Sequence, residues 1–126
     1  MGDNDAFGII DFFDKDKDYS DFETIDFKQC LEKFSCVLVA DDIVNMWIIP
    51  STYYMKTYLR KFGNEFKGID HYGVTLLPPE SLEAFLKIVK PYVLWHDKKE
   101  SEKVSILIEL INKAIRENKH MICFGI

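Results

Sequence analysis

Cysteine is scarce in this chain of 126 residues, and its spacing excludes two classes of site. The three cysteines, Cys30, Cys36 and Cys123, form no C-x-x-C pair, so neither a zinc ribbon nor a redox dithiol is present. Cys36 and Cys123 have apolar neighbours, and Cys30 lies at helical spacing from Phe27 and Phe34. In such surroundings a free thiol packs as a small hydrophobic group. We therefore expect a reduced, cytoplasmic protein.

Long hydrophobic runs are missing as well. The longest unbroken apolar run, 36–40, has five residues, whereas a membrane-spanning helix needs about 20. The first residues are acidic and lack the basic and apolar regions of a signal peptide. We expect no membrane partner.

Motifs for catalysis, cofactors and metals are also absent. The chain has only six glycines and contains no phosphate-binding glycine loop, Gly-x-Ser-x-Gly elbow or Ser-x-x-Lys motif. The segment 14–18 has the first three carboxylates of a calcium loop, but Tyr19 and Ile25 stand where that loop needs glycine and a bidentate glutamate. We expect no cofactor, no metal and no enzymatic activity. A small enzyme whose site is assembled across the fold remains the less favoured alternative.

Apolar residues, in contrast, are plentiful. Hydrophobic residues make up 48% of the chain and aromatic residues 14%, enough for a core without disulfides or metals. No internal repeat or linker interrupts the sequence, so we expect one domain over residues 1–126.

The spacing of these apolar residues predicts an α+β fold. Helices are expected over about 6–13, 24–34, 52–62, 79–89 and 101–117, and strands over 36–40, 45–49, 72–77 and 121–124. The first two strands are expected to pair as a hairpin through a turn at Asp41 and Asp42. The predicted architecture is a sheet of about four strands with helices packed mainly on one face.

Negative charge is concentrated at one end. The net charge is −5, yet residues 1–26 alone hold nine acids and two bases. This end would repel nucleic acid and attract a basic protein, although a merely solvated face is an equal alternative. The acidic residues proposed to bind a partner are Asp14, Asp16, Asp18 and Asp21, followed by Asp41 and Asp42. For the last two, a simple polar turn is the competing interpretation.

Tyrosine and tryptophan are frequent for a small core. These residues favour protein interfaces, because a flat apolar ring can be buried while its polar tip is satisfied. The candidates are Trp47, Tyr53, Tyr54, Tyr58, Tyr72, Tyr92 and Trp95. Each taken singly is equally explained as a residue at the edge of the core. The segment 53–58 is the alternative interface if the acidic residues are not used.

Four segments together resemble a known group of proteins. Residues 9–14 (IIDFFD), 42–50 (DIVNMWIIP), 72–82 (YGVTLLPPESL) and 123–126 (CFGI) are similar to small bacterial immunity proteins of contact-dependent growth inhibition and related polymorphic toxin systems. The resemblance implies a cytoplasmic, non-enzymatic protein that binds and neutralises the C-terminal toxin domain of a secreted effector, often a nuclease. It identifies no binding residue. The alternative is an acidic module that binds another basic protein.

Overall fold

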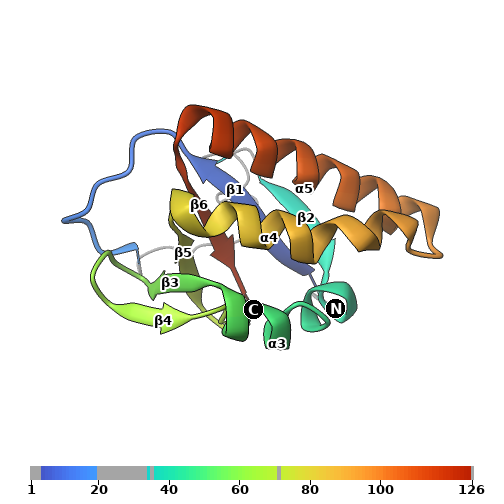
Figure 1. Ribbon diagram of the computed structural model, residues 1–126, viewed down its shortest axis with the longest axis horizontal. Helices are drawn as coiled ribbons and strands as arrows, with labels where there is room; N and C mark the ends of the chain where they lie inside the picture. Colours follow the sequence, from blue (N-terminus) through green and yellow to red (C-terminus); the bar gives the residue numbers. More distant parts are fainter. Residues whose placement is uncertain (1–3, 20–33, 35, 71, 126) are drawn as a thin grey trace.

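An antiparallel sheet of six strands, in the order β2-β1-β6-β5-β3-β4, organises the described part of the chain (Figure 1). The computed structural model describes residues 4–19, 34, 36–70 and 72–125. The candidate Asp21 and the predicted helix over 24–34, except Phe34, lie outside these residues. In chain order the elements are β1 (Asn4–Ile10), β2 (Val37–Ala40), α2 (Asp41–Asn45), α3 (Ile48–Tyr54), β3 (Lys56–Leu59), β4 (Glu65–Lys67), β5 (Val74–Leu77), the 3-10 helix η2 (Pro79–Ser81), α4 (Leu82–Val89), the 3-10 helix η3 (Lys90–Leu94), α5 (Lys98–Glu117) and β6 (His120–Phe124).

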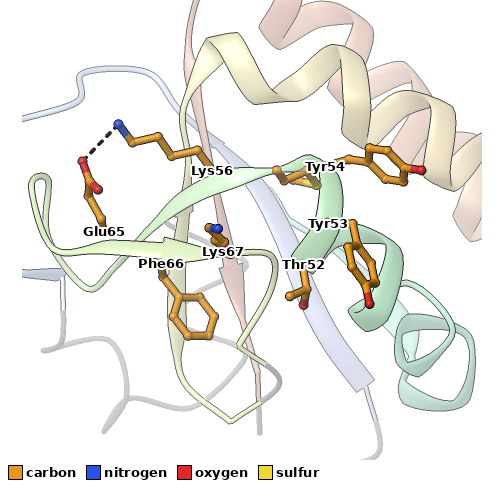
Figure 2. Close-up of a pocket in the computed structure, with 8 residues that line it drawn as sticks. Thr52, Tyr53, Tyr54, Lys56, Glu65, Phe66 and Lys67 are labelled. Carbon is orange, nitrogen blue, oxygen red and sulfur yellow. Dashed lines mark ion pairs between the residues drawn. The ribbon is translucent and has the colours of Figure 1, made fainter.

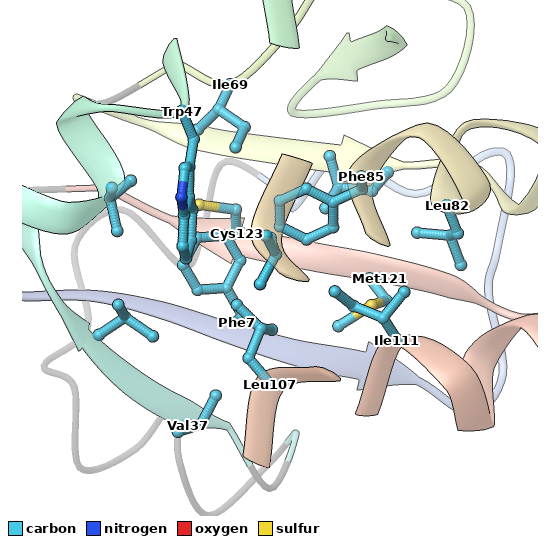
Figure 3. Packing of buried hydrophobic residues seen from close by; sticks show 14 of the residues in the cluster. Phe7, Val37, Trp47, Ile69, Leu82, Phe85, Leu107, Ile111, Met121 and Cys123 are labelled. Atoms are coloured by element: carbon cyan, nitrogen blue, oxygen red, sulfur yellow. The ribbon is translucent and has the colours of Figure 1, made fainter. Parts of the chain in front are cut away.

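The helices α4 and α5 lie side by side across one face of the sheet (Figure 1). Between helices and sheet is the larger core, in which Phe7 of β1 contacts the rings of Trp47 and Phe85 (Figure 3). α2 adds Ile43 and Val44 to the same core. The described residues therefore form an α+β domain, as predicted, with six strands where about four were expected.

The opposite face of the sheet is also buried. It carries a second core in which Tyr19 and the half-buried Phe13 and Phe34 cover apolar side chains of the strands. The strand residues of this core are Ala6, Ile10, Tyr58, Val74, Leu76, Ile122 and Phe124. Burial on both faces explains why the central strands carry apolar residues on both of their sides.

This two-sided burial overturns the helix predicted over 6–13. Residues 4–10 form β1, in which Phe7 and Ile9 face the helices while Ala6 and Ile10 face the second core. A strand with two apolar faces has no polar-apolar alternation, so chance spacing of its residues resembled a helical stripe.

The strand predicted over 45–49, and with it the hairpin through Asp41 and Asp42, is wrong as well. β2 ends at Ala40, and the chain continues as the helices α2 and α3. Ile43, Val44 and Trp47 are buried together at helical spacing, while Pro50 lies in the first turn of α3. Proline is tolerated there because its missing N–H has no partner within the helix.

The helix predicted over 52–62 is likewise contradicted. Only its beginning is helical, because α3 ends at Tyr54 and the chain becomes β3 and β4. Gly63, the residue after the predicted helix, has a φ of 91° in the connection between the two strands. The three residues of β4 are all exposed, so no burial pattern indicated that strand.

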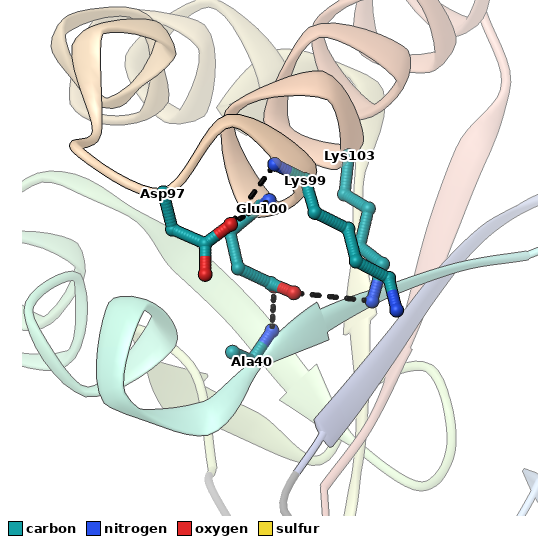
Figure 4. A network of polar contacts seen from close by, with 5 residues as sticks. All are labelled: Ala40, Asp97, Lys99, Glu100 and Lys103. Carbon is teal, nitrogen blue, oxygen red and sulfur yellow. Dashed lines mark hydrogen bonds and ion pairs between the residues drawn. The ribbon is translucent and has the colours of Figure 1, made fainter.

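The C-terminal half agrees better with the sequence. β5 and α4 fall within the predicted segments, and β6 begins one residue before its predicted range. α5 ends where Asn118 adopts a left-handed conformation. The start of α5 differs, because the helix begins at Lys98 rather than at residue 101. Asp97 caps it by accepting hydrogen bonds from the N–H groups of Lys99 and Glu100 (Figure 4). Residues 98–100, which precede the predicted helix, are therefore helical as well.

The capped end of α5 is joined to the sheet. Glu100 accepts a hydrogen bond from the N–H of Ala40 at 3.1 Å and pairs with Lys103 at 3.2 Å (Figure 4). This contact fixes the point at which β2 passes into α2. Among the described residues, no helix combines the length and the apolar character that crossing a bilayer requires.

Candidate protein-binding surface

The acidic residues after β1 lie on an exposed loop, residues 11–18, called the acidic loop below. Asp14, Asp16 and Asp18 are all exposed. Asp14 Oδ1 accepts a hydrogen bond from the N–H of Asp16 at 2.8 Å, and its carbonyl accepts one from Lys17 at 3.2 Å. One of these carboxylates therefore shapes the turn itself.

Aromatic contacts fasten this loop to the sheet. The ring of Phe13 is stacked on His120 of β6, with 3.7 Å between centroids, and also contacts Tyr19 and Phe62. The N–H of Tyr19 donates to the carbonyl of Arg60 at 2.6 Å. The acidic loop thus lies against the end of β3.

Asp41 and Asp42 lie elsewhere. They occupy the first turn of α2, where a negative charge is favourable beside the positive end of the helix dipole. Ala40, just before them, pairs with Asn4 at the start of β1, whereas the acidic loop follows the end of β1. A strand of seven residues is about 20 Å long, so the structure does not bring the two groups of acids together.

The tyrosines and tryptophans divide into two groups. Trp47 and Tyr58 are buried, and Tyr92 and Trp95 are half-buried, as expected for residues in or beside a core. Tyr53, Tyr54 and Tyr72, in contrast, are 78%, 72% and 79% exposed, and the first two lie together at the end of α3. Nearby on α3 the apolar Ile49 is exposed too. Exposed apolar groups gathered on one element indicate a contact surface more strongly than scattered ones do.

A hollow of about 520 Å³ lies beside these tyrosines, and we call it the tyrosine groove. α3 and the residues after it form one wall, and the edge strand β4 forms the other (Figure 2). The lining residues are Thr52, Tyr53, Tyr54, Met55, Lys56, Glu65, Phe66 and Lys67. A second hollow of about 590 Å³ begins on the other side of Tyr54 and extends over α4.

Hydrogen bonds through Gly68 hold the two walls together. Its N–H donates to the carbonyl of Met55 at 2.9 Å, and its own carbonyl accepts from the Thr57 hydroxyl at 2.6 Å. The next residue, Ile69, donates its N–H to Ser51 Oγ at 3.1 Å. The φ of Gly68 is +83°, and a Cβ there would approach the backbone N of Thr52 to 2.6 Å. Glycine is therefore required at this position.

Of the two lysines that line the groove, one forms an ion pair among the described residues. Lys56 forms an ion pair with Glu65 at 3.0 Å (Figure 2). The hydrogen bond and charge of Glu65 raise the pKa of Lys56 above its usual value, with smaller contributions from Tyr58 and Glu80. Lys67 lies on the opposite strand, directly across from Lys56.

Part of this surface was predicted from the sequence. Tyr53 and Tyr54 were interface candidates, but on a helix over 52–62 rather than on α3. Glu65, Phe66 and Lys67 were not predicted to belong to it. A strand of three exposed residues leaves no periodic signal in the sequence. Only the presence of an aromatic residue between two charged ones in 65–67 could have drawn attention to it.

The described residues contain no group of three or more His, Cys, Asp and Glu side chains that could hold a metal ion. The exposed groups on this surface are mainly aromatic rings and charged side chains. Comparison with known proteins gave no match to any family model, curated protein or solved structure.

Proposed function

We propose that this chain is a cytoplasmic immunity protein that binds a toxin domain and neutralises it without catalysis. The identity of the partner as a toxin follows from the sequence resemblance to immunity proteins. The proposal that the protein acts by binding another protein has separate support from the exposed side chains of α3 and β4.

The observation that carries the proposal is the exposure of Tyr53 and Tyr54 on a fixed support. Both rings project from the end of α3, which hydrogen bonds through Gly68 and Ser51 hold against the sheet. Rigid, exposed tyrosines lose little conformational entropy on binding and often contribute most of the binding energy of an interface.

The acidic loop supports the same function in a different way. Its carboxylates are solvated and stand on a turn, so they act at a distance rather than as a fitted surface. Such charges accelerate the approach of a basic partner and contribute less to the lifetime of the complex. A toxin domain that cleaves nucleic acid would itself be basic.

The test uses the toxin domain encoded by the gene directly before the one for this protein. We expect the wild type to restore growth when the two are expressed together. Replacement of both tyrosines, Tyr53→Ala and Tyr54→Ala, should raise the dissociation constant by about thirtyfold or more, as the loss of central interface aromatics does. The melting temperature should change little, because both rings are exposed.

Leu94→Ala is the matched control, since Leu94 is an exposed apolar residue of η3 at the corner between α4 and α5. It should leave binding unchanged. A wild type that neither binds the toxin domain nor restores growth would contradict the immunity function. Equal losses from Leu94→Ala and the tyrosine variant would contradict the role of the groove.

A further inference from the structure

We propose that the tyrosine groove accepts an acidic segment of the partner protein, with Lys67 as the counter-charge for one of its carboxylates. This inference rests on the proposed function and specifies the chemistry that the groove selects. It assigns the groove a charge preference opposite to that of the acidic loop.

The position of Lys67 is unfavourable for the isolated chain. Lys56 and Lys67 are partners across the antiparallel strands β3 and β4, so their side chains leave the same side of the sheet about 5 Å apart at Cβ. Like charges directly opposite one another destabilise a strand pair. The pairing of β3 with β4 therefore gives no reason for a second lysine at this position.

The one nearby carboxylate of β4 is already engaged. Glu65 pairs with Lys56 at 3.0 Å, and Glu80 acts on Lys56 more weakly. Within the part of the chain that the structure describes, Lys67 makes no ion pair. Among the described residues no carboxylate pairs with its ammonium group, which is therefore stabilised by hydration.

Binding would remove that water. Lys67 lines the same hollow as Tyr53 and Tyr54 (Figure 2), so a protein segment that fills this hollow also covers the lysine. A covered ammonium group without a counter-charge is costly. A partner that fits the groove must therefore supply an anion there.

The surroundings favour a single carboxylate over a polyanion. The second hollow, on the other side of Tyr54, is lined by Glu80 and Glu83 with Lys87, and the whole chain carries a net charge of −5. A phosphate backbone that ran from the tyrosine groove into the second hollow would be repelled by these carboxylates. A protein segment can place one acidic residue on Lys67 and apolar residues on the tyrosines.

The experiment compares Lys67→Glu, Lys67→Arg and the wild type in titration calorimetry against the same toxin domain. Lys67→Glu should weaken binding by about tenfold or more, because it opposes a like charge in the interface. Lys67→Arg should bind within about threefold of the wild type, since the charge is retained. Lys98→Glu, the same charge change on the exposed first residue of α5, is the control and should bind like the wild type.

Thermal unfolding separates this role from a structural one. Lys67→Glu puts opposite charges across β3 and β4, so its melting temperature should equal or exceed that of the wild type. Weaker binding with undiminished stability would show that Lys67 contributes to binding of the partner rather than to folding.

The outcomes are distinguishable. If the wild type binds the toxin domain and Lys67→Glu binds equally well, this inference is overturned while the proposed function stands. If the wild type does not bind, both fall together. Binding of a short single-stranded DNA that Lys67→Glu abolishes would overturn the choice of a protein segment.

Discussion

The acidic loop and the tyrosine groove both present side chains to solvent, but the fold supports them differently. The loop is a turn fastened at a few points, chiefly by Phe13 on His120 and by Tyr19 on Arg60. The groove stands on a helix and a strand pair that Gly68 joins through backbone hydrogen bonds. A surface of solvated charges tolerates movement because its effect is long-ranged. A surface of aromatic rings has to be fixed, since contact energy depends on close packing.

The largest expected effect comes from removing the support of the groove. Gly68→Ala should destabilise the protein by about 2–4 kcal/mol, because it combines a left-handed backbone with close contact to the backbone of Thr52. Denaturant unfolding measures the loss of stability. Binding of the toxin domain should weaken as well, since the two walls of the groove would separate.

Gly63→Ala is the matched control for this prediction. Gly63 also has a positive φ, +91°, but nothing lies within 4 Å of the Cβ that it would gain. Gly63→Ala should lower the free energy of unfolding by only about 1 kcal/mol, which is the cost of placing a side chain on this backbone conformation. Equal losses at the two glycines would show that the contact around Gly68 contributes nothing to stability.

A smaller effect on stability is expected from His120, the residue on which Phe13 of the acidic loop stacks. Burial lowers the pKa of His120 below its usual value of 6.5, while the charge of Glu80 opposes this shift. Nε2 of His120 is buried without a hydrogen-bond partner in the described structure, so protonation is disfavoured in the folded state. The unfolded chain binds this proton more readily, and stability should therefore fall as the pH decreases below about 6.5.

The measurement is the free energy of unfolding between pH 7.5 and 5. The carboxyl groups with lowered pKa, Asp11 and Glu117, have ordinary values of 3.8 and 4.5 and are paired with Lys119, so their effect falls at lower pH. His120→Phe retains a ring for Phe13 to stack on and should flatten the slope. An unchanged slope in that variant would assign the pH dependence to another group.

The smallest effect on stability is expected from the charges of the acidic loop. Replacing Asp14, Asp16 and Asp18 together by Asn retains an oxygen at each position and should alter stability by less than about 1 kcal/mol. The association rate with the toxin domain should fall at low salt, and the dissociation rate should stay constant. Stopped-flow kinetics at two salt concentrations measure both. A faster dissociation would mean that these carboxylates lie inside the interface, and the contrast with the groove would disappear.

Local sequence patterns predicted the C-terminal half well. Leu107, Ile111 and Ala114 repeat at helical spacing on α5 and are all buried, and β6 is a continuous apolar segment before the end of the chain. α5 buries a single face, and β6 is a short strand that is buried almost throughout. Their pattern is therefore visible without knowledge of their neighbours.

The segment from β2 to β4 was predicted poorly for a physical reason. Its apolar residues serve three different surroundings, since Trp47 enters the main core, Tyr58 the second core, and Tyr53 the exposed groove. Hydrophobicity alone does not distinguish these surroundings. A helical stripe over 52–62 was the simplest interpretation of residues that in fact belong to a helix end and a strand.

The sequence by itself determined the α+β class, the concentration of negative charge near the start of the chain and the abundance of tyrosine, because composition and local spacing carry these properties. Only the tertiary structure decided that both faces of the sheet are buried and that Asp14 and Asp41 lie at opposite ends of β1. It also decided that Tyr53, Tyr54 and Lys67 line one hollow. These relations join residues far apart in the chain through strand register and backbone hydrogen bonds, and no local pattern records which distant residue will be the partner.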